Sequence, residues 1–138
     1  MALTLYVDSA RWRAHQKSVI DQFPGIVPVC KGNGYGFGHE RLADEVSRFG
    51  SDILAVGTTY EAAKIKDWFS GDLLVLTPFR RGEEPVPLPD RVIRSVSSVD
   101  GVHALVGHPG APVLHVERTR REELGDRPPL LRALGVLG

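Results

Sequence analysis

Short apolar runs rich in β-branched residues alternate along this chain with longer amphipathic stretches. This alternation constrains the fold more than any other feature of the sequence. It is typical of β-α-β units, in which each helix carries the chain from one parallel strand to the next. The sequence therefore predicts an α/β fold built around a parallel sheet.

The same pattern places the individual elements. Strands are expected at 3–7, 26–30, 52–57, 73–76, 91–96 and 113–116. Helices are expected at 9–23, with Ser9 as its cap, and at 39–49, 58–69 and 98–106. Pro28 weakens the second strand because proline has no N–H to donate to a ladder. The proline-rich stretch 78–90 indicates a surface loop rather than a domain boundary.

The composition fits one ordinary globular domain and makes several functional classes poor first hypotheses. The 138 residues carry 17 Lys+Arg against 17 Asp+Glu. A net charge of zero lacks the broad basic field of non-specific nucleic-acid binding, so no nucleic-acid partner is expected. No stretch approaches the roughly 18 apolar residues of a membrane span, and no signal-like region opens the chain. We therefore expect a cytoplasmic protein with no membrane partner.

The single cysteine and the histidines offer little chemistry of their own. Cys30 permits no internal disulfide and supplies too few ligands for a Cys-based zinc site, so no metal is expected. We expect Cys30 to be a small core residue rather than a reactive thiol. His39 stands at a predicted helix start, where an exposed side chain is expected.

The most informative segment is the glycine-rich run from Lys31 to Gly38, which follows the predicted strand 26–30. In parallel α/β folds ligands bind at the carboxyl ends of the strands. The glycines permit positive φ and close approach of a ligand to the backbone. A partly desolvated Lys31 would be a nucleophile for a Schiff base with an aldehyde cofactor. The alternative is an ordinary turn after which Lys31 simply enters solvent.

This run follows neither of the common nucleotide-binding patterns. No Gly-Lys-Ser/Thr ends it, and its glycine spacing does not follow the dinucleotide fingerprint. It resembles instead the pyridoxal-phosphate lysine motif of the alanine racemase family, usually written Lys-Ala-Asn-Ala-Tyr-Gly-His-Gly. The segments 6–8, 55–58, 61–62 and 73–76 resemble that family's flanking segments, so the resemblance covers roughly residues 3 to 107.

The resemblance implies a fold, a cofactor and site residues. The family fold is a (β/α)8 TIM barrel of about 250 residues, so this chain would hold four to five of eight βα units. The partial barrel domain would span 1–117, followed by an atypical tail at 118–138, truncated or altered. Lys31 would form the internal aldimine with pyridoxal 5'-phosphate, Tyr35 would bind its phosphate, and Leu76 would line the pocket. Two departures are glycine at 32 and 34 and Phe37 in place of histidine.

By the same resemblance the chain is an isomerase that interconverts L- and D-alanine, with a small amino acid as substrate. The family's opposing base is a tyrosine from a separate C-terminal domain of the partner subunit, which this chain does not reach. We therefore expect a homo-oligomer or a complementing chain. Two alternatives stay open: a pyridoxal-phosphate-binding protein without catalysis, and an inactive barrel fragment.

Overall fold

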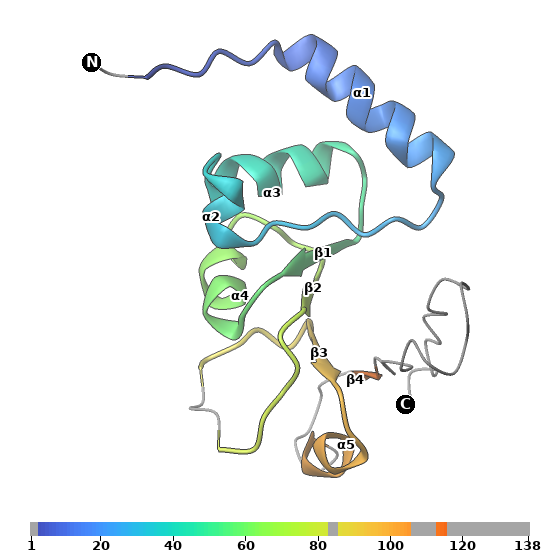
Figure 1. Cartoon of the computed structure of the whole chain (residues 1–138), viewed down its shortest axis with the longest axis vertical. Coiled ribbons are helices and arrows are strands. Elements are labelled where there is room, and N and C mark those ends of the chain that lie inside the picture. The colour runs from blue at the N-terminus through green and yellow to red at the C-terminus, as the bar shows by residue number, and fades with distance from the viewer. Residues whose placement is uncertain (1–2, 83–85, 106–112, 116–138) are drawn as a thin grey trace, which may run out of the picture.

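The computed structural model describes residues 3–82, 86–105 and 113–115, and its elements alternate as the sequence predicts (Figure 1). The helices are α1 (Ser9–Gln22), α2 (Gly32–Tyr35), α3 (His39–Arg48), α4 (Thr59–Ile65) and α5 (Val99–Leu105). The strands are β1 (Ile53–Val56), β2 (Asp72–Val75), β3 (Val92–Val96) and β4 (Val113–His115). The predicted tail at 118–138, and with it the boundary at 117, lies outside the described residues.

The strands form one parallel sheet in the order β1-β2-β3-β4. Leu54 pairs with Leu73, Leu73 pairs with Val92, and Arg94 pairs with Val113, so each strand lies beside the next one in the chain. The prediction of an α/β fold with a parallel sheet is therefore confirmed. The sheet is open over the described residues, which show no closed barrel.

One face of the sheet packs against α3 and α4 and forms the core. Its members are the buried side chains that alternate along neighbouring strands, together with helix residues: Cys30, Leu54, Val56, Leu73, Val75, Val92, Ala43, Val46, Ala62, Ile65 and Phe69. Cys30 is fully buried, and burial, reinforced by the Glu61 carboxylate, raises the pKa of its thiol to about 11. The expectation that Cys30 is a core residue is confirmed.

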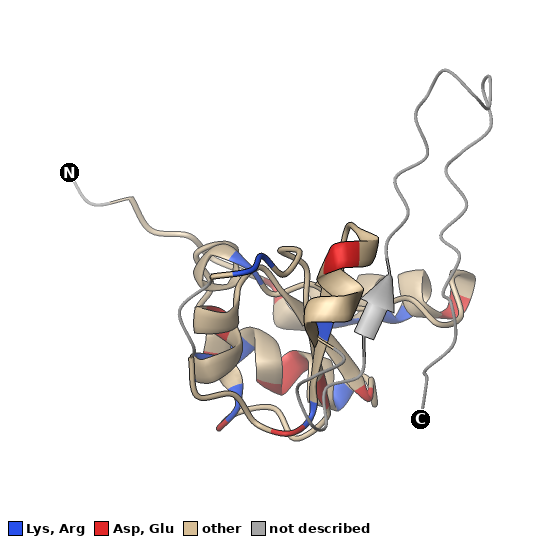
Figure 2. Ribbon diagram, turned by 90° about the horizontal axis from the view of Figure 1, so that it is seen from below, with Lys and Arg blue, Asp and Glu red and all other residues tan. Residues whose placement is uncertain are grey.

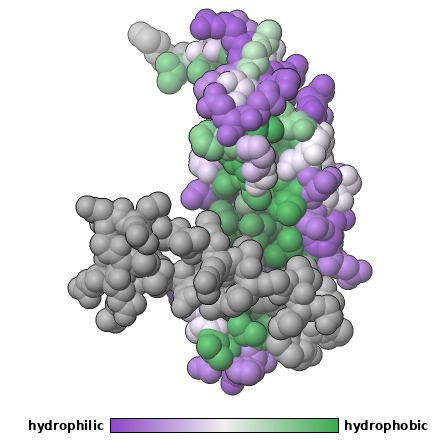
Figure 3. All heavy atoms as spheres, turned by 90° about the vertical axis from the view of Figure 1, so that its right-hand side faces the viewer, coloured by the Kyte–Doolittle hydropathy of each residue, from purple (hydrophilic) through white to green (hydrophobic). Residues whose placement is uncertain are grey.

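The opposite face of the sheet is less covered. Strand alternation turns Val29, Leu74 and Leu76 to this side, and Val29 and Leu76 are 38% and 41% exposed. Figure 3 shows hydrophobic residues gathered on the side of the molecule that is turned away from α2 and α4. Parallel sheets are normally covered on both faces, so this surface is a candidate for contact with another chain.

The predicted strand at 3–7 is wrong. These residues run extended into solvent, where Leu3 is 102% and Tyr6 89% exposed, and no ladder joins them to another described segment. An apolar alternation gives a strand only where a partner backbone is available. The first helix is capped by Asp8 rather than Ser9, since the Asp8 carboxylate accepts hydrogen bonds from the N–H groups of Ala10 and Arg11 at 3.1 Å each.

The predicted strand at 26–30 is reduced to a single parallel bridge between Val29 and Ala55. The Ala55 N–H donates to the Pro28 carbonyl at 2.8 Å, and the Cys30 N–H donates to the Ala55 carbonyl at 2.7 Å. Pro28 lacks the N–H with which it would extend the ladder towards β1. The segment still lies beside β1, which is what positions the residue after it.

The predicted helix 39–49 ends close to where the sequence places its stop signal, and the predicted helix 58–69 is shorter than expected. The α3 helix ends at Arg48, with Phe49 as its cap and Gly50 at a φ of 71°. The predicted helix 58–69 stops at Ile65, and a turn carries the chain to Phe69, whose N–H donates to the Ile65 carbonyl at 3.2 Å. Phe69 nevertheless stays in the core, only 3% exposed.

Charged residues of both signs are interspersed over the described elements (Figure 2). One ion pair links α1 to the rest of the fold: the Arg13 guanidinium donates to both carboxylate oxygens of Glu45 on α3, at 2.9 and 2.6 Å. The Glu45 side chain is 4% exposed. The hydrogen bonds from Arg13 hold the pKa of the Glu45 carboxyl below its usual range, although burial opposes this shift.

This lowered pKa predicts a loss of stability in acid. A carboxylate whose pKa is lower in the folded chain stabilises the fold above its unfolded value of about 4.3, and the contribution disappears as pH falls through the folded pKa. Glu45→Gln should therefore flatten the decline in unfolding free energy below about pH 4.3, measured by urea unfolding at several pH values. The exposed Glu40→Gln is the control, and an equal flattening by both variants would contradict the role of Glu45.

Candidate functional site

The carboxyl ends of three neighbouring segments meet at one edge of the sheet. Beyond β2, the Leu76 N–H donates to the Val56 carbonyl at 2.8 Å, and the Thr77 N–H donates to the Gly57 carbonyl at 2.9 Å. Lys31 follows Cys30 at the same edge, because Cys30 is bonded to Ala55. Ligands of parallel α/β folds bind at such an edge.

Strand alternation places Lys31, Gly57 and Leu76 on one face of this edge. They each follow a residue that is buried against the helices, namely Cys30, Val56 and Val75. A Cβ built on Gly57 would lie 3.3 Å from the Lys31 Cβ, which shows how closely these two residues approach. The structure therefore brings together two of the three predicted site residues, Lys31 and Leu76.

The loop after Lys31 adopts left-handed backbone conformations, as its glycines predict. Gly32, Asn33, Gly34 and Tyr35 have φ values of 59°, 53°, 64° and 54°. Gly34 is the position that needs glycine most, because a Cβ there would lie 3.2 Å from Leu42 Cδ1. The loop closes on itself through the Asn33 carbonyl, which accepts from the Gly36 and Gly38 N–H groups at 3.3 and 3.0 Å.

Lys31 is exposed, so the partial desolvation expected of it is wrong for this structure. The exposure follows from the position of Lys31 on the less covered face. The space around it is also open, since a Cβ at Gly32 or Gly36 would meet nothing within 4 Å. An accessible primary amine beside an open glycine loop fits the attachment point of an aldehyde cofactor such as pyridoxal phosphate.

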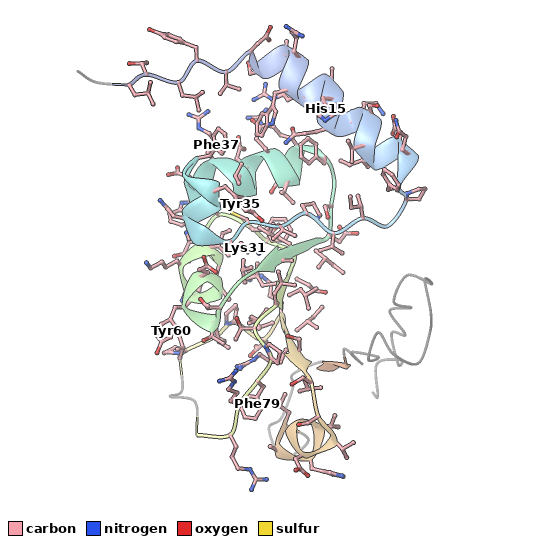
Figure 4. The ribbon with its side chains drawn as sticks, in the orientation of Figure 1. His15, Lys31, Tyr35, Phe37, Tyr60 and Phe79 are labelled. Atoms are coloured by element: carbon pink, nitrogen blue, oxygen red, sulfur yellow. The ribbon has the colours of Figure 1, made fainter. Side chains whose placement is uncertain are left out.

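Tyr35 lies in the loop with Lys31 and is 58% exposed (Figure 4). Its side chain lines a groove of about 330 Å³ beneath α1, together with Trp12 and Phe37. The rings of Trp12 and Phe37 stack with their centroids 6.2 Å apart. Phe37, which departs from the family motif, thus anchors the loop against α1.

Glu61 is a site residue that the sequence analysis missed. Its carboxylate accepts from the Gly32 N–H at 2.6 Å and from the Thr58 N–H at 3.0 Å, while the Thr58 hydroxyl accepts from the Glu61 N–H at 3.3 Å. The last two bonds form a capping box at the start of α4. The Thr-x-x-Glu spacing was the available signal for the cap. No local signal marked the contact with Gly32.

The expectation that His39 is exposed is wrong, since it is 8% exposed. Its ring is packed at the start of α3, and its Nε2 lies 3.7 Å from Glu61 Oε1. The contact between α3 and α4 covers this position. A prediction from the start of α3 alone does not include that contact. His39 and Glu61 therefore lie together behind the loop that carries Lys31.

Two further features concern the part of the chain that the structure describes. Within it, no helix is long and apolar enough to cross a membrane. The same residues hold no group of three or more His, Cys, Asp or Glu side chains arranged to bind a metal ion.

With this geometry established, comparison with solved structures places the fold. The crystal structure of alanine racemase from Oenococcus oeni is similar with a TM-score of 0.54 at 21% identity, over 67% of this chain and 27% of that one. The alanine racemase of Clostridium difficile 630 is similar with a TM-score of 0.51 at 17% identity, over 80% of this chain and 30% of that one. The fold is racemase-like in part.

At these identities the likeness shows the fold alone. It supports a partial α/β fold of the TIM-barrel type, and this chain spans less than a third of the length of either racemase. No protein-family model and no curated protein matches the chain. The comparisons therefore identify neither a cofactor nor a reaction for this chain.

The close approach at Gly57 predicts the effect of a single methyl group. In Gly57→Ala the new Cβ would lie 2.6 Å from Glu61 Oε2 and 3.3 Å from the Lys31 Cβ, so the carboxylate must leave its present position. We expect a loss of about 1–3 kcal/mol in unfolding free energy, measured by urea denaturation. Gly101→Ala is the control, because its nearest contact is Ser98 Oγ at 3.3 Å. An equal or smaller loss at Gly57 would contradict this packing.

Proposed function

We propose that this chain binds pyridoxal 5'-phosphate covalently through Lys31 and forms the lysine-bearing part of an amino acid racemase. The observation that carries the proposal is the position of Lys31: an exposed amine at the carboxyl edge of parallel strands, next to an open glycine loop. The structural likeness to alanine racemases supports it. The proposed reaction is interconversion of the L and D forms of a small amino acid, alanine by resemblance.

The described residues divide the work of holding such a cofactor. Lys31 would supply the amine for attachment, the Tyr35 hydroxyl would donate to the phosphate, and Leu76 would give an apolar contact. The cofactor, when bound, would supply an electron sink for negative charge at the Cα of an amino acid. The Lys31 amine would hold a proton at one face of that carbon.

Inversion at Cα requires a second base on the opposite face, and we propose that another chain supplies it. The sheet offers a place for association. Since Ala55 bonds to Pro28 and Cys30, the N–H and C=O of Val29 point away from β1. This edge faces the groove beneath α1, which Val29 lines, and adjoins the less covered apolar face that carries Val29 and Leu74. We propose that a second copy of the chain covers them.

The second candidate is a pyridoxal-phosphate-binding protein without racemase activity, in which this face would stay uncovered. A chain that binds the cofactor on its own and stays monomeric would have no opposing base. The two candidates share the attachment at Lys31 and differ in proton exchange at the Cα of alanine. They are separated by incubating the loaded chain with alanine in deuterated water.

Cofactor attachment is tested by titrating the purified chain with pyridoxal phosphate and following visible absorbance. The sample is then reduced with borohydride and mapped by peptide mass spectrometry. We expect a reducible linkage at Lys31 that is lost in Lys31→Ala and kept in Lys17→Ala, a lysine that is paired with Asp21 on α1. Labelling that is spread over several lysines, or unchanged in Lys31→Ala, would overturn the proposal.

Association is tested by light scattering over a range of chain concentrations. We expect the mean mass to rise with concentration, and Val29→Asp to shift this rise to concentrations about tenfold higher, because a charge would be buried at the interface. Val99→Asp is the matched control on α5, where Val99 is 65% exposed. A mass that stays monomeric at every concentration would contradict association with a second copy.

A further inference from the structure

Behind the loop that carries Lys31 lie a partly buried acid, Glu61, and a buried histidine, His39, for which the proposed function has no role. Glu61 is 17% exposed and His39 is 8% exposed at their side chains. Glu61 Oε1 lies 2.6 Å from the Gly32 nitrogen, and Oε2 lies 3.0 Å from the Thr58 nitrogen. One carboxylate thus joins the backbone just after Lys31 to the start of α4.

We propose that Glu61, with His39 beside it, is a positioning residue that fixes the peptide after Lys31 and so aims the Lys31 amine. This inference rests on the proposed function, because it takes Lys31 as the attachment point of the cofactor. In the cofactor-free chain, the Gly32 N–H already donates to the Glu61 carboxylate on α4, the helix that follows β1.

Glu61 restrains the loop from outside, in addition to the hydrogen bonds within the loop, among them the one from the Tyr35 N–H to the Lys31 carbonyl at 3.0 Å. Gly32 has a φ of 59°, and a Cβ there would meet nothing within 4 Å, so sterics leave this residue many backbone states. The direction of the Lys31 side chain depends on the backbone on both sides of it. The Cys30 N–H fixes the preceding side by its bond to Ala55. On the following side, the Lys31 carbonyl accepts from the Tyr35 N–H, and the Gly32 N–H of the same peptide donates to Glu61.

The charge of Glu61 strengthens this bond, because hydrogen bonds to an ionised carboxylate are stronger than neutral ones. Gly57 leaves the room that the carboxylate occupies, since a Cβ there would lie 2.6 Å from Oε2. Because Gly57 has no Cβ, the carboxylate can accept from both N–H groups at once.

His39 closes the other side of the carboxylate. Its Nε2 is buried, lies 3.7 Å from Glu61 Oε1, and finds no hydrogen-bond partner among the described residues. A ring nitrogen at that distance is too far for a hydrogen bond but limits the positions open to the carboxylate. The family motif has histidine where this chain has Phe37, and here a histidine stands two residues later, against Glu61.

The test measures two properties of each variant: the exchange rate of the Gly32 amide and the rate at which Lys31 is labelled. Amide hydrogen exchange at Gly32 is measured in the cofactor-free chain, and the rate of borohydride-reducible labelling of Lys31 by pyridoxal phosphate is measured in parallel. Loss of a charged hydrogen bond should raise Gly32 exchange in Glu61→Gln by about ten- to a hundredfold. Lys31 labelling should slow by about tenfold.

Two controls separate positioning from general damage. Glu40→Gln removes the same charge from the exposed surface of α3 and should change neither readout. Thr58→Ala removes the hydroxyl of the capping box but leaves the Glu61 contact with Gly32, so it should weaken α4 without raising Gly32 exchange. Equal exchange at Gly32 in the wild type and Glu61→Gln would overturn the inference.

The histidine gives a second route if Glu61→Gln fails to fold. His39→Ala, which removes the ring beside the carboxylate, should raise Gly32 exchange, and His39→Gln, whose longer side chain fills much of the same space, should restore most of the protection. The same low exchange in His39→Ala as in the wild type would contradict the role of His39. If the wild type forms no linkage at Lys31, the proposed function fails, while the exchange data still decide whether Glu61 holds Gly32.

Discussion

Hydrogen bonds between parallel backbones at the carboxyl edge of the sheet are the constraint on which the candidate site depends. The Cys30 N–H donates to Ala55 at 2.7 Å and the Leu76 N–H to Val56 at 2.8 Å, so three segments far apart in sequence end at one place. Their side chains alternate between a core packed by α3 and α4 and a less covered face. This arrangement determines which residues lie beside Lys31 and leaves its side chain exposed.

Much of the fold could be predicted from the sequence because its signals are local. The α3 helix, from His39 to Arg48, has its apolar spacing and its Gly50 stop within one short stretch. The runs 3–7 and 26–30 carry equally apolar patterns, but a strand also needs a partner backbone. The first of them has no partner within the described residues, and the second pairs with Ala55 alone. The availability of a partner is a tertiary property, and in 26–30 the local sequence marks the loss only through Pro28, which has no N–H for the ladder.

For the candidate site too, the residues with a local sequence signal could be predicted and those placed by tertiary contacts could not. Lys31 and its glycine loop were predicted from one continuous motif, and the loop has the positive φ angles that its glycines imply. Glu61 stands 29 residues from Gly32, and its role at the loop depends on two strand ends being adjacent in space. His39 was expected at the surface because only its own helix was considered. Its burial results from the packing of α3 against α4 beside Glu61.

We propose that the carboxyl edge around Lys31 forms a cofactor site in this chain. A crystal structure of the chain after reaction with pyridoxal phosphate and borohydride would locate the attached group. We expect a pyridoxyl group joined to Lys31 Nζ, lying against Leu76, with its phosphate within hydrogen-bond distance of the Tyr35 hydroxyl. A group attached to another lysine, or one on Lys31 that extends into solvent without touching Leu76 or Tyr35, would contradict it.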